Sequence, residues 1–551
     1  MRRFAIIVLL FALASTAYAQ HPKKAVKAYE AAEEAFLKRD YQKAHKLVLK
    51  AVVEDPNYAE AWLLEGEIGL ETKDDDLAIL GYENALAADS MIFPPAALTL
   101  ARLYDKRGSY KRETFLLRWY LSKDFNNAFN QATANEMLAK ASFRDWALSH
   151  PVDFEPQNLG SEINTTDDEY INALTFDGSQ LLFTRKIDRG NGFFEEKVFV
   201  SQKEEDHWTE PQPLVFVAFP DDIDPGAAFL SADGTKLYLT GCGWGRESGC
   251  DLYVSHLDIG GHWSMPRRIE GSVNTGSWES QPCVSADGKE LYFVSRRNGH
   301  ADIYCCRRNA DRSWGEPQNL GAPINTKGSE MAPFLHPDGR TLYFSSDSHV
   351  GMGGFDLFMS RRDENGQWQE PVNLGFPINT QSDEINFFVA ADGRTAFISS
   401  QREGGYGGYD IYTFELPEEV RSDSANYFSN VDVTELTTGD AIVLQNIQFE
   451  FNSYALTEDS HVGIQILTDF LRRNPELKVE LAGHTDNVGN EKYNQKLSAD
   501  RAEVVRQALI ANGIDEHRLT AKGYGSSKPL CPNDSDEHRA LNRRTEMIII
   551  D

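Results

Sequence analysis

The sequence predicts a multidomain protein with an all-α N-terminal part, an all-β middle part and an α+β C-terminal part. In residues 22–150, small residues recur with a period of thirty-four. In residues 153–415, strand patterns recur about every fifty residues, and in residues 440–551 short strands alternate with amphipathic helices. A chain of 551 residues is long enough for three or four such domains.

Residues 1–19 are expected to be a cleaved export signal. Basic residues at 2 and 3 precede an apolar run at 4–14, and Ala-Tyr-Ala at 17–19 is a small-x-small cleavage site. The apolar run is too short to span a membrane comfortably, and no Cys follows it for lipid attachment. We therefore expect an exported, periplasmic protein without a membrane anchor of its own.

Residues 22–150 predict paired helices in repeats. Small or helix-breaking residues are matched thirty-four positions later, in the pairs Ala32/Gly66, Ala44/Ala78, Ala51/Ala85 and Pro56/Ser90. This pattern resembles tetratricopeptide repeats, in which small residues lie where the two helices of a pair cross. A weaker third copy lies around Ala101 and Tyr110, and residues 123–150 are expected to form a closing helix or helix pair. Such stacks usually bind a protein segment, so we expect partner docking; a purely structural spacer is the alternative.

Residues 153–415 predict β-units of about four short strands each. The repeated signals are an Asp-Gly turn followed by an alternating strand, a later Asp-hydrophobic-aromatic strand, a Trp shortly before a Pro, and a linker ending in Ile-Asn-Thr. The turns fall at Asp177, Asp233, Asp287, Asp338 and Asp392. Repeated units of this length predict a β-propeller, and they resemble the PD40 (WD40-like) family with five blades. The last copy lacks the Trp-x-x-Pro tail, which residues 154–160 supply at the start, so we expect the first and last units to pair.

The middle part is not expected to be an enzyme. Its Asp-Gly turns lack the spacing of a sialidase-type Asp box, and neither a nucleophile elbow nor a zinc-protease helix nor a phosphate-binding loop occurs. The acidic stretches 167–169 and 221–224 fit no calcium loop of known spacing. Cys242 and Cys250 bracket a hairpin-like loop and are a candidate disulfide in an oxidising compartment. The remaining cysteines are expected to be buried free thiols.

Residues 416–439 are polar and acidic and are expected to form a linker of modest flexibility. The C-terminal domain at 440–551 is then expected to have a βαβαβ order, with a first strand at 447–451. Gly-His-Thr-Asp at 483–486 ends the next strand and precedes a helix that carries Asn494 and Arg501. An apolar stripe of Tyr493, Leu497, Val504 and Ala508 would border Arg501. A guanidinium held against a core needs an anion, which Asp486 or a ligand carboxylate could supply.

These residues, together with Gly-Tyr-Gly at 523–525 and Asn-Arg-Arg at 542–544, resemble the OmpA-like peptidoglycan-binding family over roughly residues 441–551. The resemblance implies that Asp486 and Arg501 grip diaminopimelate of the peptidoglycan stem peptide. It places Asn452, Asn494 and one of the two arginines, for which we name Arg544, at supporting positions. The chemistry is consistent, because a carboxylate can accept from the ammonium of an α-amino acid while a guanidinium binds its carboxylate. A structural Asp–Arg ion pair is the alternative.

The composition limits the choice of partners. A net charge of −29 argues against binding nucleic acid or an anionic lipid surface through a basic patch. We expect a non-enzymatic scaffold without cofactor or metal, which binds peptidoglycan, docks envelope proteins and reaches the outer membrane only indirectly. The domain order also resembles accessory subunits of the type IX secretion machinery, although a small β-sandwich and a lipoprotein Cys are missing. The alternatives are a periplasmic sensor or carbohydrate-binding propeller that the wall domain localises, and a propeller hydrolase.

Overall fold

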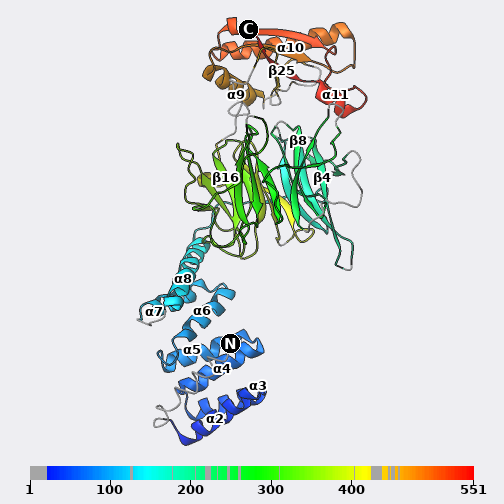
Figure 1. The fold of residues 1–551 in the computed structure, drawn as a ribbon. Helices are drawn as coiled ribbons and strands as arrows, with labels where there is room; N and C mark the ends of the chain where they lie inside the picture. Colours follow the sequence, from blue (N-terminus) through cyan, green and yellow to red (C-terminus); the bar gives the residue numbers. More distant parts are fainter. Residues whose placement is uncertain are drawn as a thin grey trace. The chain divides into compact units, whose positions relative to one another are not determined.

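The computed structural model divides the chain into two compact units, Met1–His150 and Pro151–Asp551 (Figure 1). It describes residues 21–550 apart from short segments, so the expected export signal lies outside the described residues. The segments left out are 124–127, 176–177, 191, 205–206, 217–224, 233, 245–248, 259–261, 310, 403, 424–436, 445–446, 448, 450–452 and 457–459. In the part that is described, no helix combines the length and apolar character needed to cross a bilayer.

The first unit consists of packed helices. They are α2 (Lys23–Leu37), α3 (Tyr41–Glu54), α4 (Ala59–Thr72), α5 (Asp75–Ala88), α6 (Pro95–Lys106), α7 (Tyr110–Leu121) and α8 (Ala128–Ser149). Consecutive helices pack as the pairs α2/α3, α4/α5 and α6/α7, and α8 packs on α7. The region expected to close the stack as a helix or a pair contains the single helix α8 in its described part.

Small residues allow the helices of a pair to cross closely. A Cβ added to Gly81 on α5 would lie 2.2 Å from the backbone nitrogen of Gly66 on α4, and one added to Gly69 would lie 2.3 Å from that of Ala78. Neither contact leaves room for a side chain. The prediction that Gly66 and Ala78 mark the crossing of two helices is therefore confirmed.

The second unit begins with five small antiparallel sheets. Their strand orders are β2-β3-β4-β5 with β6 beside β4, β10-β9-β8-β7, β11-β12-β13-β14, β15-β16-β17-β18 and β1-β21-β20-β19. The first two sheets use β2 (Asp168–Leu174), β3 (Gln180–Asp188), β4 (Phe194–Glu204), β5 (His207–Trp208), β6 (Gln212–Pro213), β7 (Pro225–Leu230), β8 (Lys236–Cys242), β9 (Cys250–His256) and β10 (Arg267–Arg268). The third and fourth use β11 (Glu279–Val284), β12 (Glu290–Ser295), β13 (Asp302–Arg307), β14 (Gln318–Asn319), β15 (Glu330–Leu335), β16 (Thr341–Ser346), β17 (Asp356–Arg361) and β18 (Val372–Asn373). The last uses β1 (Gln157–Asn158), β19 (Ile385–Val389), β20 (Thr395–Ser400) and β21 (Asp410–Glu415).

The Asp-Gly dipeptides form the tight turns between the first two strands of a sheet. At the third sheet, the amide of Gly288 donates to the carbonyl of Ser285, and Gly288 has a φ of 70°, which a residue with a side chain adopts only under strain. At the fourth and last sheets, the side chains of Asp338 and Asp392 accept hydrogen bonds from the backbone amides of Thr341 and Thr395. Their role as turn formers is confirmed there, whereas Asp177 and Asp233 lie outside the described residues.

An Asn-Thr-x-x-x-Glu segment connects one sheet to the next. Asn274 donates to the carbonyl of Leu252 on β9 and accepts from its amide, while Thr275 donates through its amide and hydroxyl to Glu279, the first residue of β11. The same contacts recur for Asn164/Glu169, Asn325/Glu330 and Asn379/Glu384. All four carboxylates are fully buried. We call this contact set the Asn–Thr–Glu tie.

The start of the second unit joins its last sheet. β1 pairs antiparallel with β21, with Gln157 opposite Thr413 and Asn158 opposite Tyr412. The N-terminal Pro-x-Asn-Leu-Gly segment thus supplies the outer strand of the last sheet. The first strands of the sheets also contact one another in sequence, β2 with β7, β7 with β11, β11 with β15 and β15 with β19, and β19 contacts β2.

Two local features concern the ends of these sheets. Cys242 and Cys250 lie opposite each other on β8 and β9 and form a disulfide, while Cys283, Cys305, Cys306 and Cys531 are free. The linker expected at 416–439 begins later than predicted, because Leu416 and Val420 belong to the core of the sheets. The carbonyl of Val420 accepts a hydrogen bond from the hydroxyl of Tyr343. These two residues are buried although the segment is mainly polar, so its composition did not predict their burial.

The C-terminal domain is one mixed sheet with helices. Its strands are ordered β22-β25-β23-β24, with β23 and β24 parallel and the other pairs antiparallel. The elements are β22 (Ala441–Val443), α9 (Ser460–Arg473), β23 (Lys478–His484), α10 (Glu491–Ala511), β24 (Leu519–Gly525), α11 (Asp536–Asn542) and β25 (Thr545–Ile550). The first described strand of the sheet is β22, and most of the strand expected at 447–451 lies outside the described residues. The helix α11 was not predicted.

The buried face of α10 differs from the predicted apolar stripe. The buried residues are Asn494, Ser498, Ala502, Val505 and Leu509, one position along from the predicted set, and Tyr493 is exposed. Glycines of the sheet explain the shift. A Cβ on Gly483 would lie 2.1 Å from the carbonyl oxygen of Ser498, and one on Gly523 would lie 2.4 Å from the amide of Ala499. The helix therefore packs directly on the backbone of β23 and β24, where only small residues fit.

Candidate functional site

Asp486 lies in the loop between β23 and α10, and its carboxylate is held from two sides. One oxygen accepts from the amide of Val488 at 2.9 Å, and the other accepts from Nη1 of Arg543 at 2.7 Å. The parallel strands β23 and β24 fix the start of this loop, since the amide of Thr485 donates to the carbonyl of Gly525. Asp486 itself is largely buried. The loop therefore presents one carboxylate in a defined position.

Asn494 fixes the same loop from the first turns of α10. Its side-chain amide donates to the carbonyl oxygens of Asp486 at 3.2 Å and of Val488 at 3.0 Å. Asn494 is buried. The structure thus assigns Asn494 contacts with the loop backbone, which position Asp486.

Arg501 also lies on α10, C-terminal to Asn494. Its Nε donates to the carbonyl of Ser453 at 2.9 Å, and its guanidinium lies 4.9 Å from the centre of the Phe449 ring. Burial and the nearby charge of Arg543 lower the pKa of Arg501, while the carboxylate of Asp486 acts in the opposite direction. The direct ion pair of Asp486 is thus with Arg543, and Arg501 lies close enough for both charges to act on it; we call these three residues the cluster. The predicted Asn452 lies outside the described residues, although its neighbour Ser453 contacts Arg501.

The structure places the two arginines differently: Arg543, and not the Arg544 named from the sequence, contacts Asp486. Arg544 is almost fully buried and binds Glu546 at 2.7 Å, together with the carbonyl oxygens of Asn542 and Lys528. Arg543 is about half exposed, at 47%, and contacts Asp486. Consecutive residues entering the strand β25 point to opposite sides, so only one of the two can reach the cluster. The sequence signal did not show which side faces the loop.

A buried charge network lies behind the cluster. Burial alone would raise the pKa of Glu546, but His484, at 3.2 Å, and Arg544 lower it to about 2. His484 stacks on Tyr524 with parallel rings. His484, Arg544 and Glu546 therefore support the sheet beneath the Gly-His-Thr-Asp turn. Sequence reasoning did not single out Glu546.

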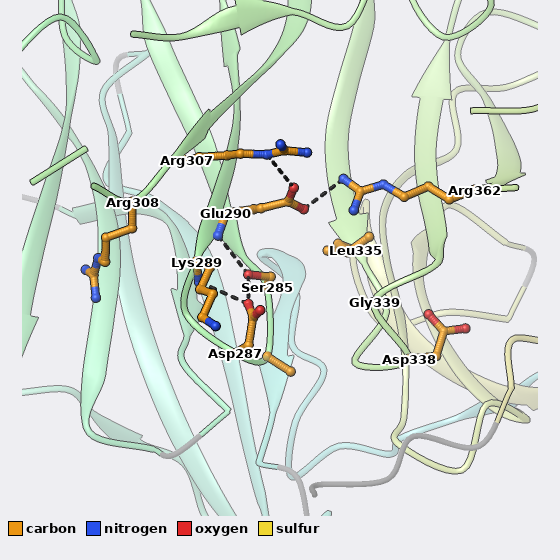
Figure 2. Close-up of a pocket in the computed structure, with 11 residues that line it drawn as sticks. Ser285, Asp287, Lys289, Glu290, Arg307, Arg308, Leu335, Asp338, Gly339 and Arg362 are labelled. Carbon is orange, nitrogen blue, oxygen red and sulfur yellow. Dashed lines mark hydrogen bonds and ion pairs between the residues drawn. The ribbon is translucent and has the colours of Figure 1, made fainter. Parts of the chain in front are cut away.

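A pocket of about 400 Å³ lies between the third and fourth sheets (Figure 2). The carboxylate of Glu290, on the third sheet, accepts hydrogen bonds from two arginines. Nε of Arg307 donates at 3.2 Å, and Nη2 of Arg362, from the fourth sheet, donates at 2.7 Å. Asp287 and Asp338 accept hydrogen bonds within their own turns. The carboxylates of the pocket are thus occupied by protein donors. They serve contacts within and between the sheets.

The described residues contain no group of three or more His, Cys, Asp or Glu side chains placed to hold a metal ion. The acidic stretch 167–169 is used structurally, because Asp168 accepts from the amide of Tyr409 and Glu169 binds Thr165 and Arg185. The second acidic stretch, 221–224, lies outside the described residues.

Comparison with known proteins places the cluster in a family context. The OmpA family matches residues 448–543, so the C-terminal part of the chain is an OmpA-family domain. Outer membrane porin F of Pseudomonas fluorescens is 42% identical over 101 residues, which make up 18% of this chain and 31% of the porin. Peptidoglycan-binding protein ArfA of Mycobacterium tuberculosis is 39% identical over 83 residues, 15% of this chain and 26% of that protein.

A solved structure of the peptidoglycan-associated lipoprotein from Burkholderia pseudomallei is 29% identical, covering 19% of this chain and 87% of that chain at a TM-score of 0.18. The chain spans less than a third of the length of the two curated relatives described above. The similarity therefore concerns one domain.

Proposed function

We propose that the C-terminal domain binds peptidoglycan and anchors the chain to the cell wall. The observation that carries this proposal is the cluster of two guanidinium groups, Arg501 and Arg543, beside the single carboxylate of Asp486. The cluster has a surplus positive charge within a chain of net charge −29. The carboxylate of a bound ligand would pair with the second guanidinium of the cluster. ArfA, a relative that is named as a peptidoglycan-binding protein, supports the same ligand.

The ligand would be the amino-acid end of diaminopimelate in the stem peptide. Its ammonium would bind Asp486, and its carboxylate would bind the guanidinium of Arg501, with Arg543 adding a second positive charge. Asn494 would hold the loop, as its hydrogen bonds to the backbone indicate. Asn452 stays a candidate from the sequence, whereas Arg544 is removed from the ligand set because Glu546 occupies it.

For the rest of the chain we propose two docking modules for envelope proteins. The five sheets would form a closed five-bladed propeller, which the pairing of β1 with β21 and the contact of β19 with β2 support. The helices of the first unit would be tetratricopeptide repeats, which the close crossing of α4 and α5 supports. The chain would then be a non-enzymatic periplasmic scaffold that ties an outer-membrane-associated assembly, such as the type IX secretion machinery, to the wall.

Sedimentation with purified peptidoglycan sacculi tests the anchor. We expect the wild type to sediment with sacculi, and Asp486→Ala and Arg501→Ala to stay in solution while remaining folded by circular dichroism. Arg472→Ala, on α9, is the matched control and should sediment like the wild type. If the wild type fails to sediment, or if the Asp486 and Arg501 variants sediment equally well, the cluster is a structural ion-pair network.

A further inference from the structure

The first sheet carries a hairpin that is longer than its counterparts. β3 and β4 pair over nine positions, from Gln180 opposite Gln202 to Asp188 opposite Phe194. The equivalent strands pair over six positions in the third, fourth and last sheets. At about 3.3 Å per residue, the paired part of this hairpin is about 10 Å longer than in these equivalents, whose connecting loops are longer. It is seen beside the label β4 in Figure 1.

The tip of this hairpin exposes two adjacent phenylalanines. Phe193 is 74% exposed and Phe194 is 56% exposed. The tip is held by hydrogen bonds, since the amide of Arg189 donates to the carbonyl of Phe193 and the amide of Phe193 donates to that of Gly190. Gly190 has a φ of 81°, which the tight turn requires. The two rings are therefore exposed at the tip of this hairpin.

The charges around the tip are balanced, unlike those of the whole chain. Three basic residues, Lys186, Arg189 and Lys197, offset three acidic ones, Asp188, Glu195 and Glu196. Arg189 and Lys197 pair with Glu195, and the ammonium of Lys186 lies 4.5 Å from the centre of the Phe194 ring. The net charge of −29 would repel an anionic surface elsewhere, but not at this tip.

We propose that Phe193 and Phe194 insert into the interfacial layer of a phospholipid bilayer. A narrow tip cannot form a broad interface, whereas two rings beside a basic side chain suit the boundary between acyl chains and headgroups. The ammonium of Lys186, beside the Phe194 ring, would meet the phosphate groups. This membrane contact goes beyond the proposed wall anchor and does not depend on it.

Flotation with vesicles tests the contact. The mature chain, starting at Gln20 so that the apolar residues 4–14 are absent, is mixed with vesicles of phosphatidylethanolamine and phosphatidylglycerol. We expect the wild type to float with the vesicles, and Phe193→Ser/Phe194→Ser to lower the partition coefficient by about tenfold or more, because the apolar surface that enters the bilayer is lost. Phe193→Trp/Phe194→Trp should retain binding and shift tryptophan emission to the blue on mixing.

Phe115→Ser is the matched control, because Phe115 is 70% exposed on α7. It should float like the wild type. Sedimentation with sacculi should be unchanged in the Ser/Ser variant, which separates this contact from the wall anchor. If the wild type does not float, or if the Ser/Ser variant floats equally well, the proposal is wrong.

Discussion

Arg543 and Arg544 are neighbours in sequence with different surroundings. Arg543 is half exposed and contacts Asp486, whereas Arg544 is buried against Glu546. The sequence could place an arginine pair at the edge of the site, because the Asn-Arg-Arg motif lies just before the last strand. It could not say which member faces the loop, since that depends on the register of β25 against β23.

Alanine substitutions should separate the two arginines. Arg543→Ala is expected to weaken sacculus binding and to change the free energy of unfolding by less than about 1 kcal/mol, because its ion pair is partly exposed. Arg544→Ala should lower the free energy of unfolding by about 3 kcal/mol, because Glu546 loses its buried partner. Sedimentation and urea unfolding measure the two effects. Equal losses of stability in both variants would contradict this division.

Glu384 makes stability depend on pH. It is fully buried in an Asn–Thr–Glu tie, and burial raises its pKa to about 8. An unfolded glutamate has a pKa of about 4.3. Below that pH the carboxyl is protonated in both states, and its contribution to folding is fully present. As pH rises toward 8, only the unfolded state loses the proton, so the free energy of unfolding falls, by an amount on the order of 4 kcal/mol.

Glu384→Gln should remove this dependence. Chemical unfolding between pH 4.5 and pH 8 is expected to show a flatter stability profile for the variant than for the wild type. Glu364→Gln is the control, since Glu364 is exposed, and its profile should follow the wild type. Parallel profiles for all three proteins would show that Glu384 ionises at its ordinary pKa.

At the scale of elements, side chains that cross from one sheet to the next hold the β part together. Composition and spacing predicted the strands, the Asp-Gly turns and the Ile-Asn-Thr connections, because each is a local pattern. The prediction failed where packing decides: the buried face of α10 follows glycines in β23 and β24, and residues 416–420 are buried despite their polarity. Such contacts join segments distant in sequence, so a local pattern cannot reveal them.

The contact of Arg362 with Glu290 should stabilise the packing of the third and fourth sheets (Figure 2). Arg362→Ala is expected to lower the free energy of unfolding by about 3 kcal/mol, because Glu290 is largely buried and loses its closest cation. Arg307→Ala is a matched control on the same carboxylate. Arg307 is 82% exposed, so its removal should cost less than about 1 kcal/mol.

Urea unfolding of the full chain measures both variants against the wild type. A larger loss in Arg307→Ala than in Arg362→Ala would show that the cross-sheet ion pair is not the one that matters.

At the scale of the molecule, the segment before β2 should be indispensable for the last sheet. Asn158 donates to Asp410 at 2.8 Å, and Phe154 packs edge-on against Phe414. A chain that starts at Pro151 retains these contacts, whereas a chain that starts at Gly160 loses β1 and leaves the edge of β21 unpaired. We expect the shorter chain to unfold at a temperature lower by roughly 5 °C or more in a thermal scan. Equal unfolding temperatures would argue against a ring closed by β1.

The pairing of β1 with β21 also bears on how such a chain is delivered. Asn158 and Asp410 are separated by 252 residues. A chain that emerges N-terminus first releases the outer strand of this sheet long before the strands that must receive it. In the export that we propose, the β part could complete its last sheet only after almost the whole of it had crossed the inner membrane. Such an export would suit an unfolded chain, in which a chaperone could protect β1 until β21 emerges.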